Sequence, residues 1–176
     1  SSQLVLALQT IVSRNTNPLE STVLTIGMIG GGYNFNIISD EVVLKGTARA
    51  YTEENRKMIH DRLHEICDGI GSAYGACIEV DYSDGYPPTV NSKSESDKVL
   101  LAAEKIVGGG VQPPYLTMGG EDMSYYLQKV PGCFLFVGSA PDGIRVPHHC
   151  SHFDIEERAL LVGSSIWVQL VEDVLT

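Results

Sequence analysis

The spacing of apolar residues predicts five secondary-structure elements in the first half of the chain. Apolar side chains recur every three or four positions along the buried face of a helix, and every second position along a half-buried strand. These rules predict, in order, a helix over 3–14, strands over 22–31 and 41–51, a helix that follows Thr52, and a strand over 76–83. With one more strand in front, this order would be the β-α-β-β-α-β layer of a ferredoxin-like domain.

The helix after Thr52 carries the most signals. Thr52 is a good N-cap, and Glu53 and Glu54 follow it in the first turn, where carboxylates favour the positive end of the helix dipole. The apolar positions of its buried face are Ile59, Leu63, Ile66 and Ile70. Their spacing predicts the clearest amphipathic helix of the chain.

The second half begins with a break in composition. Residues 83–96 contain two prolines and several serine and glycine residues, which is typical of a hinge or linker. Beyond it the pattern predicts a helix over 97–107, a loop that opens a short helix within 119–130, a strand over 133–138 and a final helix within 155–175. This strand is apolar throughout, so we expect it to be buried on both faces. The chain is thus predicted to be an α/β protein with two domains, 1–84 and 85–176.

Composition and charge exclude several partners. The 176 residues carry a net charge of −10 and no basic patch, so we expect neither nucleic acid nor an anionic membrane surface as a partner. No apolar run approaches the ~20 residues of a membrane-spanning helix. The four cysteines form no CxxC pair and are expected to be buried free thiols of a cytoplasmic protein. The sequence starts without methionine and inside a helical pattern, so we expect it to be cut from a longer chain.

A cluster of imidazoles is the strongest chemical signal in the sequence. One loop holds three histidines and a cysteine, which are His148, His149, Cys150 and His152. A zinc or manganese site needs three or four ligands that converge, and a short loop offers one, or two through His149 and His152. A metal ligand and a polar loop therefore both stay open on the residues alone. The other histidines, His60 and His64, lie on the amphipathic helix, and we expect them to be surface residues.

Two glycines precede a predicted helix start in the segment MGGEDMSYYL, residues 118–127. Bare backbone N–H groups at Gly119 and Gly120 would favour an anion such as a carboxylate. Glu121 and Asp122 also suit ordinary capping of the helix, and on the residues alone capping is the favoured interpretation. The glycine spacing matches neither a dinucleotide fingerprint nor a P-loop, so no nucleotide is indicated.

Asn36 and Arg49 are a weaker pair of candidates. They stand 13 positions apart, across a turn and along a strand. Alone the pair indicates little, because an arginine that ends a strand is usually a solvated residue at the rim of the sheet.

Six segments are informative when they are taken in order: NIISD, LKGTARAY, YPPTVN, MGGEDMSYYL, PGCFLFVG and HHCSHFDIEERAL. They resemble the C-terminal part of the M20 metallopeptidase/amidohydrolase family, and the resemblance runs over essentially the whole chain. The most similar branch holds the N-acyl-amino-acid, hippurate and indole-acetyl-amino-acid hydrolases. The resemblance implies a catalytic α/β domain with two divalent metal ions, zinc or manganese, and an inserted ferredoxin-like lid domain that often forms the dimer contact.

The resemblance also implies roles for individual residues. His149, four residues before Phe153, matches a metal ligand of the family. The residues that match substrate-binding positions are Asn36, Arg49, Gly119 and Gly120. The general-base glutamate and the other metal ligands are implied to lie upstream, so the fragment itself is expected to be inactive. Ser39 stands where the family has proline, which we expect to loosen the turn that aims Asn36.

The function implied by the resemblance is hydrolysis of the amide bond of N-acyl amino acids. The implied assembly is a homodimer that forms its contact through residues 1–84. Two rivals stay open, a non-catalytic ferredoxin-like module for dimerisation or binding, and an M20 dipeptidase. An upstream segment that carries His, Asp or Cys and Glu ligands would separate the enzymes from the binding module.

Overall fold

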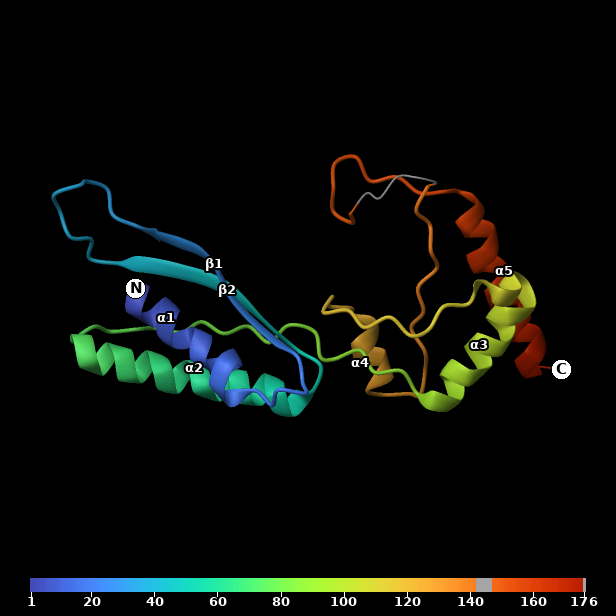
Figure 1. Ribbon diagram of the computed structural model, residues 1–176, viewed down its shortest axis with the longest axis horizontal. Helices are drawn as coiled ribbons and strands as arrows, with labels where there is room; N and C mark the ends of the chain where they lie inside the picture. Colours follow the sequence, from blue (N-terminus) through green and yellow to red (C-terminus); the bar gives the residue numbers. More distant parts are fainter. Residues whose placement is uncertain (142–146, 176) are drawn as a thin grey trace. The chain divides into compact units, whose positions relative to one another are not determined.

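The computed structural model describes residues 1–141 and 147–175 and has a mixed α/β fold (Figure 1). Its elements are α1 (Ser2–Thr10), the π-helical turn η1 (Ile11–Asn15), β1 (Thr22–Gly31), β2 (Val42–Ala50), α2 (Glu53–Tyr74), α3 (Lys93–Val107), the 3₁₀ turn η2 (Gly108–Gly110), α4 (Met123–Leu127) and α5 (Arg158–Leu175). Contacts divide the chain into two compact units. The first is 1–88 with 117–121, and the second is the rest. The predicted domains, 1–84 and 85–176, stay a prediction.

The first unit is an antiparallel hairpin covered by two helices. β1 pairs with β2 from Thr22 opposite Ala50 to Gly31 opposite Val42, with a bulge between Ile26 and Met28. Both α1 and α2 lie on the same side of the hairpin (Figure 1). The buried apolar side chains between these layers are Leu4, Leu8, Ile11, Leu24, Ile59 and Cys67. The predicted helix, two strands and second helix are therefore confirmed in order.

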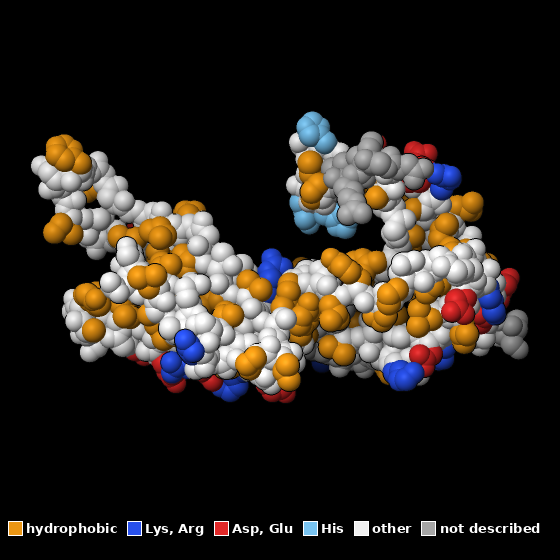
Figure 2. Space-filling model, viewed as in Figure 1, with side chains coloured by type: hydrophobic (Ala, Val, Ile, Leu, Met, Phe, Trp, Pro, Cys, Tyr) orange, Lys and Arg blue, Asp and Glu red, His pale blue; other side chains and the backbone are white. Residues whose placement is uncertain are grey.

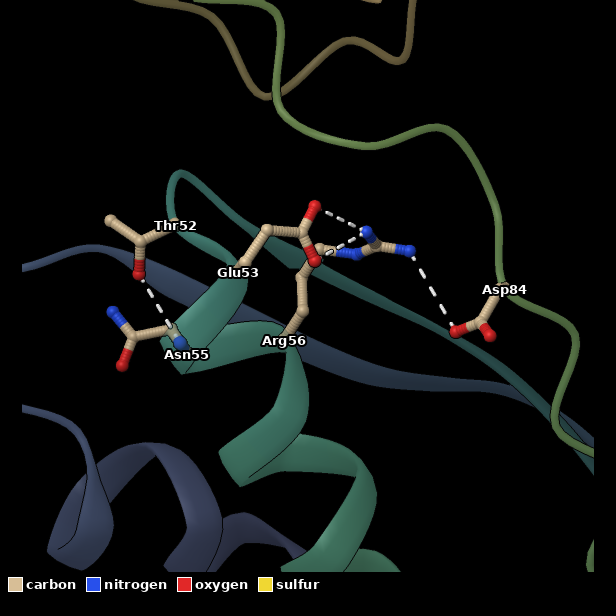
Figure 3. A network of polar contacts seen from close by, with 5 residues as sticks. All are labelled: Thr52, Glu53, Asn55, Arg56 and Asp84. Carbon is tan, nitrogen blue, oxygen red and sulfur yellow. Dashed lines mark hydrogen bonds and ion pairs between the residues drawn. The ribbon is translucent and has the colours of Figure 1, made fainter. Parts of the chain in front are cut away.

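Local signals at the start of α2 act as the sequence predicts. The Thr52 hydroxyl accepts a hydrogen bond from the backbone N–H of Asn55 at 3.2 Å, which is the N-cap contact. Within the first turn, Arg56 Nη1 donates to Glu53 at 2.6 Å, and Arg56 Nη2 lies 3.7 Å from the carboxylate of Asp84 (Figure 3). These contacts fasten the helix start to the segment that leaves the unit.

The predicted strand over 76–83 is wrong. Its burial alternates as expected, with Ile78, Val80 and Tyr82 half-buried and the residues between them exposed. Within the described residues, however, the sheet consists of β1 and β2 alone, and this segment joins no backbone ladder. Alternation reports which side chains face the core, whereas a strand also needs a neighbour for its N–H and C=O groups. The ferredoxin-like layer therefore stays a prediction.

The predicted strand over 133–138 is also wrong. The backbone N–H of Phe134 donates to the side-chain oxygen of Asn91 at 2.8 Å, and the Asn91 side-chain N–H donates to the Phe134 carbonyl at 2.8 Å. The side-chain amide of Asn91 thus binds both the N–H and the C=O of Phe134, which are the groups that a neighbouring strand would bind. Burial on both faces is wrong as well, because Phe136 is 53% exposed.

The second unit is built on a pair of helices. α3 packs against α5, where Ala102, Ala103 and Ile166 are buried, and Lys105 forms an ion pair with Asp173 at 2.5 Å. The predicted helices over 97–107 and within 155–175 are confirmed. α3 begins four residues earlier than predicted, directly after its N-cap residue Ser92. Among the described residues, no helix is long and apolar enough to cross a membrane.

The four cysteines, all among the described residues, form no disulfide. Burial raises the pKa of the Cys67 thiol, and the negative charge of Asp68 adds to this shift. Cys67 is therefore the buried thiol that the sequence predicts. The same expectation is wrong for Cys77, which is exposed.

Candidate functional site

Arg49 connects two candidate segments that lie far apart in the sequence. It is the penultimate residue of β2, and its Nη1 donates a hydrogen bond to the backbone carbonyl of Met118 at 2.5 Å. This contact places the guanidinium beside the segment that continues into Gly119 and Gly120. An arginine has five N–H donors, and in the described part of the chain the Met118 carbonyl is its one hydrogen-bond acceptor. The other donors remain available to a ligand.

The two glycines differ in their surroundings. The N–H of Gly119 donates a hydrogen bond to Thr117 Oγ1 at 3.2 Å. The expectation of a bare N–H group is therefore wrong for Gly119. A Cβ atom at Gly119 would meet only that hydroxyl, at 3.5 Å, whereas one at Gly120 would lie 3.0 Å from the ring of Tyr86. Asp122 stands at the N-cap position of α4, as the capping interpretation expects, but its side chain forms no cap hydrogen bond.

This difference leads to a matched prediction. Gly120→Ala should lower the free energy of unfolding by about 1 kcal/mol, because the added methyl group crowds the Tyr86 ring and overpacking costs ~1–3 kcal/mol. We expect a loss of stability at the low end of this range, because Tyr86 is 52% exposed and its ring can shift. Gly119→Ala is the control and should leave stability unchanged or slightly raised. Thermal unfolding of both variants measures the difference, and equal losses would contradict it.

Asn36 lies in the loop between β1 and β2, where it is exposed. Ser39 ties the base of this loop, because its hydroxyl accepts from the N–H of Gly32 at 3.1 Å and donates to the carbonyl of Glu41 at 2.6 Å. The looser turn expected from the missing proline stays a prediction, and these two hydrogen bonds act against it. Arg49 is at the other end of β2, seven residues beyond Val42, which is ~24 Å along a strand. The structure does not bring Asn36 and Arg49 of one chain together.

The histidine loop exposes its imidazoles, and histidine side chains stand on the surface there (Figure 2). His149 has a φ of 62°, in the left-handed region that few residues other than glycine adopt. Its ring centroid lies 6.5 Å from that of His148, whose ring packs edge-on against Phe153 at 5.5 Å. The loop turns tightly behind them, since the N–H of Phe153 donates to the carbonyl of Cys150 at 3.1 Å.

The donors of this loop fit one ligand of a metal site and not the whole site. His149 offers an exposed imidazole, which is a suitable ligand for a divalent transition metal. Across residues 1–141 and 147–175, no three His, Cys, Asp or Glu side chains lie close enough to share an ion. His60 and His64 come near each other on α2, with ring centroids 4.5 Å apart, but they contribute only two imidazoles. The described residues do not form a metal centre by themselves.

A groove in the first unit was not predicted from the sequence. It has a volume of about 460 Å³ and is lined by Val12, Thr16, Asn17, Pro18, Glu20, Ser21, Thr22, Val23, Tyr51 and Met118. The lining residues come from η1, the turn after it, the start of β1, the residue that follows β2 and the MGGED segment. No local pattern signals such a groove, because it exists only where these segments meet.

The sequence as a whole matches a family model described as peptidase family M20/M25/M40, over residues 4–173. The chain belongs to this family. The resemblance that the motifs indicated is therefore confirmed. The match includes the β2 end, the MGGED segment and the histidine loop.

Named relatives in the family differ in what they act on. The chain is 40% identical over 164 residues to an N-acetyl-L-cysteine deacetylase of Bacillus subtilis, covering 93% of this chain and 38% of that protein. It is 34% identical over 167 residues to thermostable carboxypeptidase 1 of Saccharolobus solfataricus, covering 93% and 42%. The chain therefore spans about two fifths of the length of these relatives.

A solved structure shares the fold. The YXEP protein of Bacillus subtilis, described as a dinuclear metal-binding peptidase of the M20 family, superimposes with a TM-score of 0.80 at 27% identity. The superposition covers 99% of this chain and 44% of that protein. The mixed α/β fold is thus that of the corresponding part of an M20 peptidase.

Proposed function

We propose that this chain is part of a metal-dependent amidohydrolase that cleaves the amide bond of N-acyl amino acids. The observation that carries the proposal is the hydrogen bond from Arg49 Nη1 to the Met118 carbonyl. It sets a guanidinium with available N–H donors beside Gly119 and Gly120. The deacetylase relative supports an acylated amino acid as the substrate class, because its name states that chemistry.

Arg49 binds the α-carboxylate of the substrate in this proposal. A guanidinium grips a carboxylate through two parallel N–H···O bonds, which fix the orientation of the substrate. The bond to Met118 uses one donor and leaves enough for such a pair. Gly119 and Gly120 allow the substrate to approach the backbone closely, since neither carries a side chain.

Asn36 acts on a substrate bound to a second copy of the chain. Its loop lies at the far end of the hairpin from Arg49, and ~24 Å of strand separates the two ends of β2. No small acyl amino acid spans that distance. We therefore propose a homodimer through residues 1–84, a ferredoxin-like lid in the full protein, in which Asn36 of one copy donates a hydrogen bond to the developing oxyanion in the site of the other.

His149 is one ligand of the metal site. Its left-handed backbone supports this role, because strained conformations of non-glycine residues cluster at functional sites. The other ligands and the general-base glutamate are proposed to come from outside these 176 residues. Two divalent ions, zinc or manganese, would polarise the substrate carbonyl and lower the pKa of a bound water. A cytoplasmic location completes the proposal.

The proposal is tested on the full-length protein loaded with Zn²⁺ or Mn²⁺. N-acetyl amino acids should be hydrolysed with a kcat/KM at least about 10-fold above that for dipeptides with the same C-terminal residue. The opposite preference would favour the peptidase alternative, which the carboxypeptidase relative supports. If neither substrate is cleaved, the chain is a module for binding or dimerisation.

A further inference from the structure

We propose that His60 and His64, one turn apart on α2, bind a divalent transition metal ion such as Zn²⁺ or Ni²⁺ at the surface of the first unit. This site is separate from the proposed catalytic metal site, because His149 belongs to the other unit. The two imidazoles supply two ligands, and water fills the remaining positions. An ion bound in this way exchanges with the solvent and links two successive turns of the helix.

The helix holds the two imidazoles at a spacing that suits one ion. Residues four positions apart lie one above the other on a helix, and the ring centroids of His60 and His64 are 4.5 Å apart. Two imidazoles that bind one ion at about 2.0–2.1 Å have their centroids roughly 4.5–5 Å apart. The ring planes are tilted by 53°, so the nitrogen lone pairs, which lie in these planes, can converge on one point.

Asp61 fixes the tautomer of His60. Its Oδ1 lies 3.1 Å from His60 Nδ1, and its Oδ2 accepts a hydrogen bond from Lys57 Nζ at 2.5 Å. The hydrogen bond from Lys57, and after it the one from His60, lowers the pKa of the Asp61 carboxyl, which is therefore ionised at neutral pH. An ionised carboxylate only accepts hydrogen bonds, so His60 Nδ1 carries a proton and Nε2 of the neutral ring offers its lone pair. A carboxylate behind the imidazole is the usual outer partner of a histidine that binds a metal.

A second contact orients the His60 ring. Its centroid lies 5.0 Å from that of Tyr82, and the two planes are perpendicular. The carboxylate and the tyrosine together limit the rotation of the ring, which lowers the entropy cost of binding an ion. The side chain of His60 is nevertheless 44% exposed, so an ion with its water molecules can reach it from the solvent.

The neighbouring histidines of the other unit show the contrast. His148 and His149 are adjacent in the sequence, and their ring centroids lie 6.5 Å apart. This distance is larger than two imidazoles on one ion allow. Spacing on a helix, and not the number of imidazoles, therefore distinguishes the pair on α2.

The experiment adds Ni²⁺ to the untagged full-length protein after its catalytic site has been filled with Zn²⁺ and the excess removed. Calorimetric titration of the wild type should show one further ion per chain. His64→Gln should weaken this binding at least about 10-fold, because the second ligand of a pair acts at a high effective concentration. Asp61→Asn keeps both imidazoles and should weaken it about 10-fold, as the loss of an outer carboxylate does.

His152→Gln is the matched control. It removes an exposed imidazole from outside α2 and should bind Ni²⁺ as the wild type does. Absence of a further ion in the wild type, or equal binding by the wild type and His64→Gln, would overturn the site. Loss of the ion in His152→Gln alone would place it in the histidine loop and would also overturn the proposal.

Hydrogen exchange on the wild-type protein gives a second readout, which holds even if a substitution disturbs folding. Ni²⁺ should slow amide exchange severalfold in the turns of α2 around His60 and His64, because an ion that links two turns opposes their local opening. Slowing that is confined to residues 148–152 would contradict the proposal.

Discussion

His149→Ala in the full-length protein should lower kcat/KM for N-acyl amino acids about 1000-fold. Metal ions contribute several kcal/mol to stabilising the transition state, and each 1.36 kcal/mol corresponds to a factor of ten in rate. The fold should remain intact, because His149 is exposed and its imidazole has no hydrogen-bond partner in the described chain. Steady-state kinetics and circular dichroism together measure both expectations.

His152→Ala is the matched control for this variant. It removes an exposed imidazole from the same loop and should change kcat/KM less than twofold. A large loss in both variants would mean that the loop supplies two ligands. Retained turnover in His149→Ala would remove His149 from the metal site.

A mixture of two variant proteins, His149→Ala and Asn36→Ala, tests the proposed dimer. Each variant alone should be nearly inactive, because one lacks a metal ligand and the other lacks the proposed oxyanion donor, whose loss costs ~100–1000-fold. Random exchange of subunits makes half of the dimers mixed, and one of the two sites in each mixed dimer is intact if Asn36 acts across the interface. A mixture should then recover about one quarter of the wild-type activity. No recovery would place Asn36 and His149 in the site of a single chain.

Arg49→Lys should lower kcat/KM for N-acyl amino acids at least about 10-fold. Lysine keeps the positive charge but loses the planar fork that binds a carboxylate through two bonds. Such a charge-assisted pair is worth ~1.5–3 kcal/mol, which corresponds to about one to two factors of ten in rate. Steady-state kinetics on the full-length protein measure the loss.

A substrate analogue separates two roles of Arg49. In an N-acyl amino acid amide, the α-carboxylate is replaced by a neutral group, so the loss in Arg49→Lys should be much smaller. Equal losses on both substrates would mean that Arg49 acts by holding the MGGED segment through the Met118 carbonyl. The carboxylate would then be bound by another residue.

The elements that were predicted correctly are those with local causes. Thr52 caps α2 by accepting a hydrogen bond from a backbone N–H group three residues away. Ile59 lies on the apolar face of that helix, and such a face is predictable without knowing which element it packs against. The strands that were predicted wrongly needed a partner from elsewhere in the chain. At residues 133–138, the side chain of Asn91, 43 positions before Phe134, takes the place of that partner. Apolar patterning reports the faces of an element, and it contains no information on which backbone groups meet.

The same distinction between local patterns and tertiary packing applies to the candidate site. Motifs in the sequence were sufficient to name the family and to select His149, Arg49 and the two glycines as candidates, because residue type and short spacing carry that information. Only the tertiary structure showed that Arg49 reaches Met118 across 69 positions, that Asn36 stands at the opposite end of the hairpin, and that Glu20 lines a groove. The physical reason is that distances between segments depend on how the hairpin and helices pack. Short-range patterns determine the elements and the chemistry they carry, and packing alone determines which of them meet.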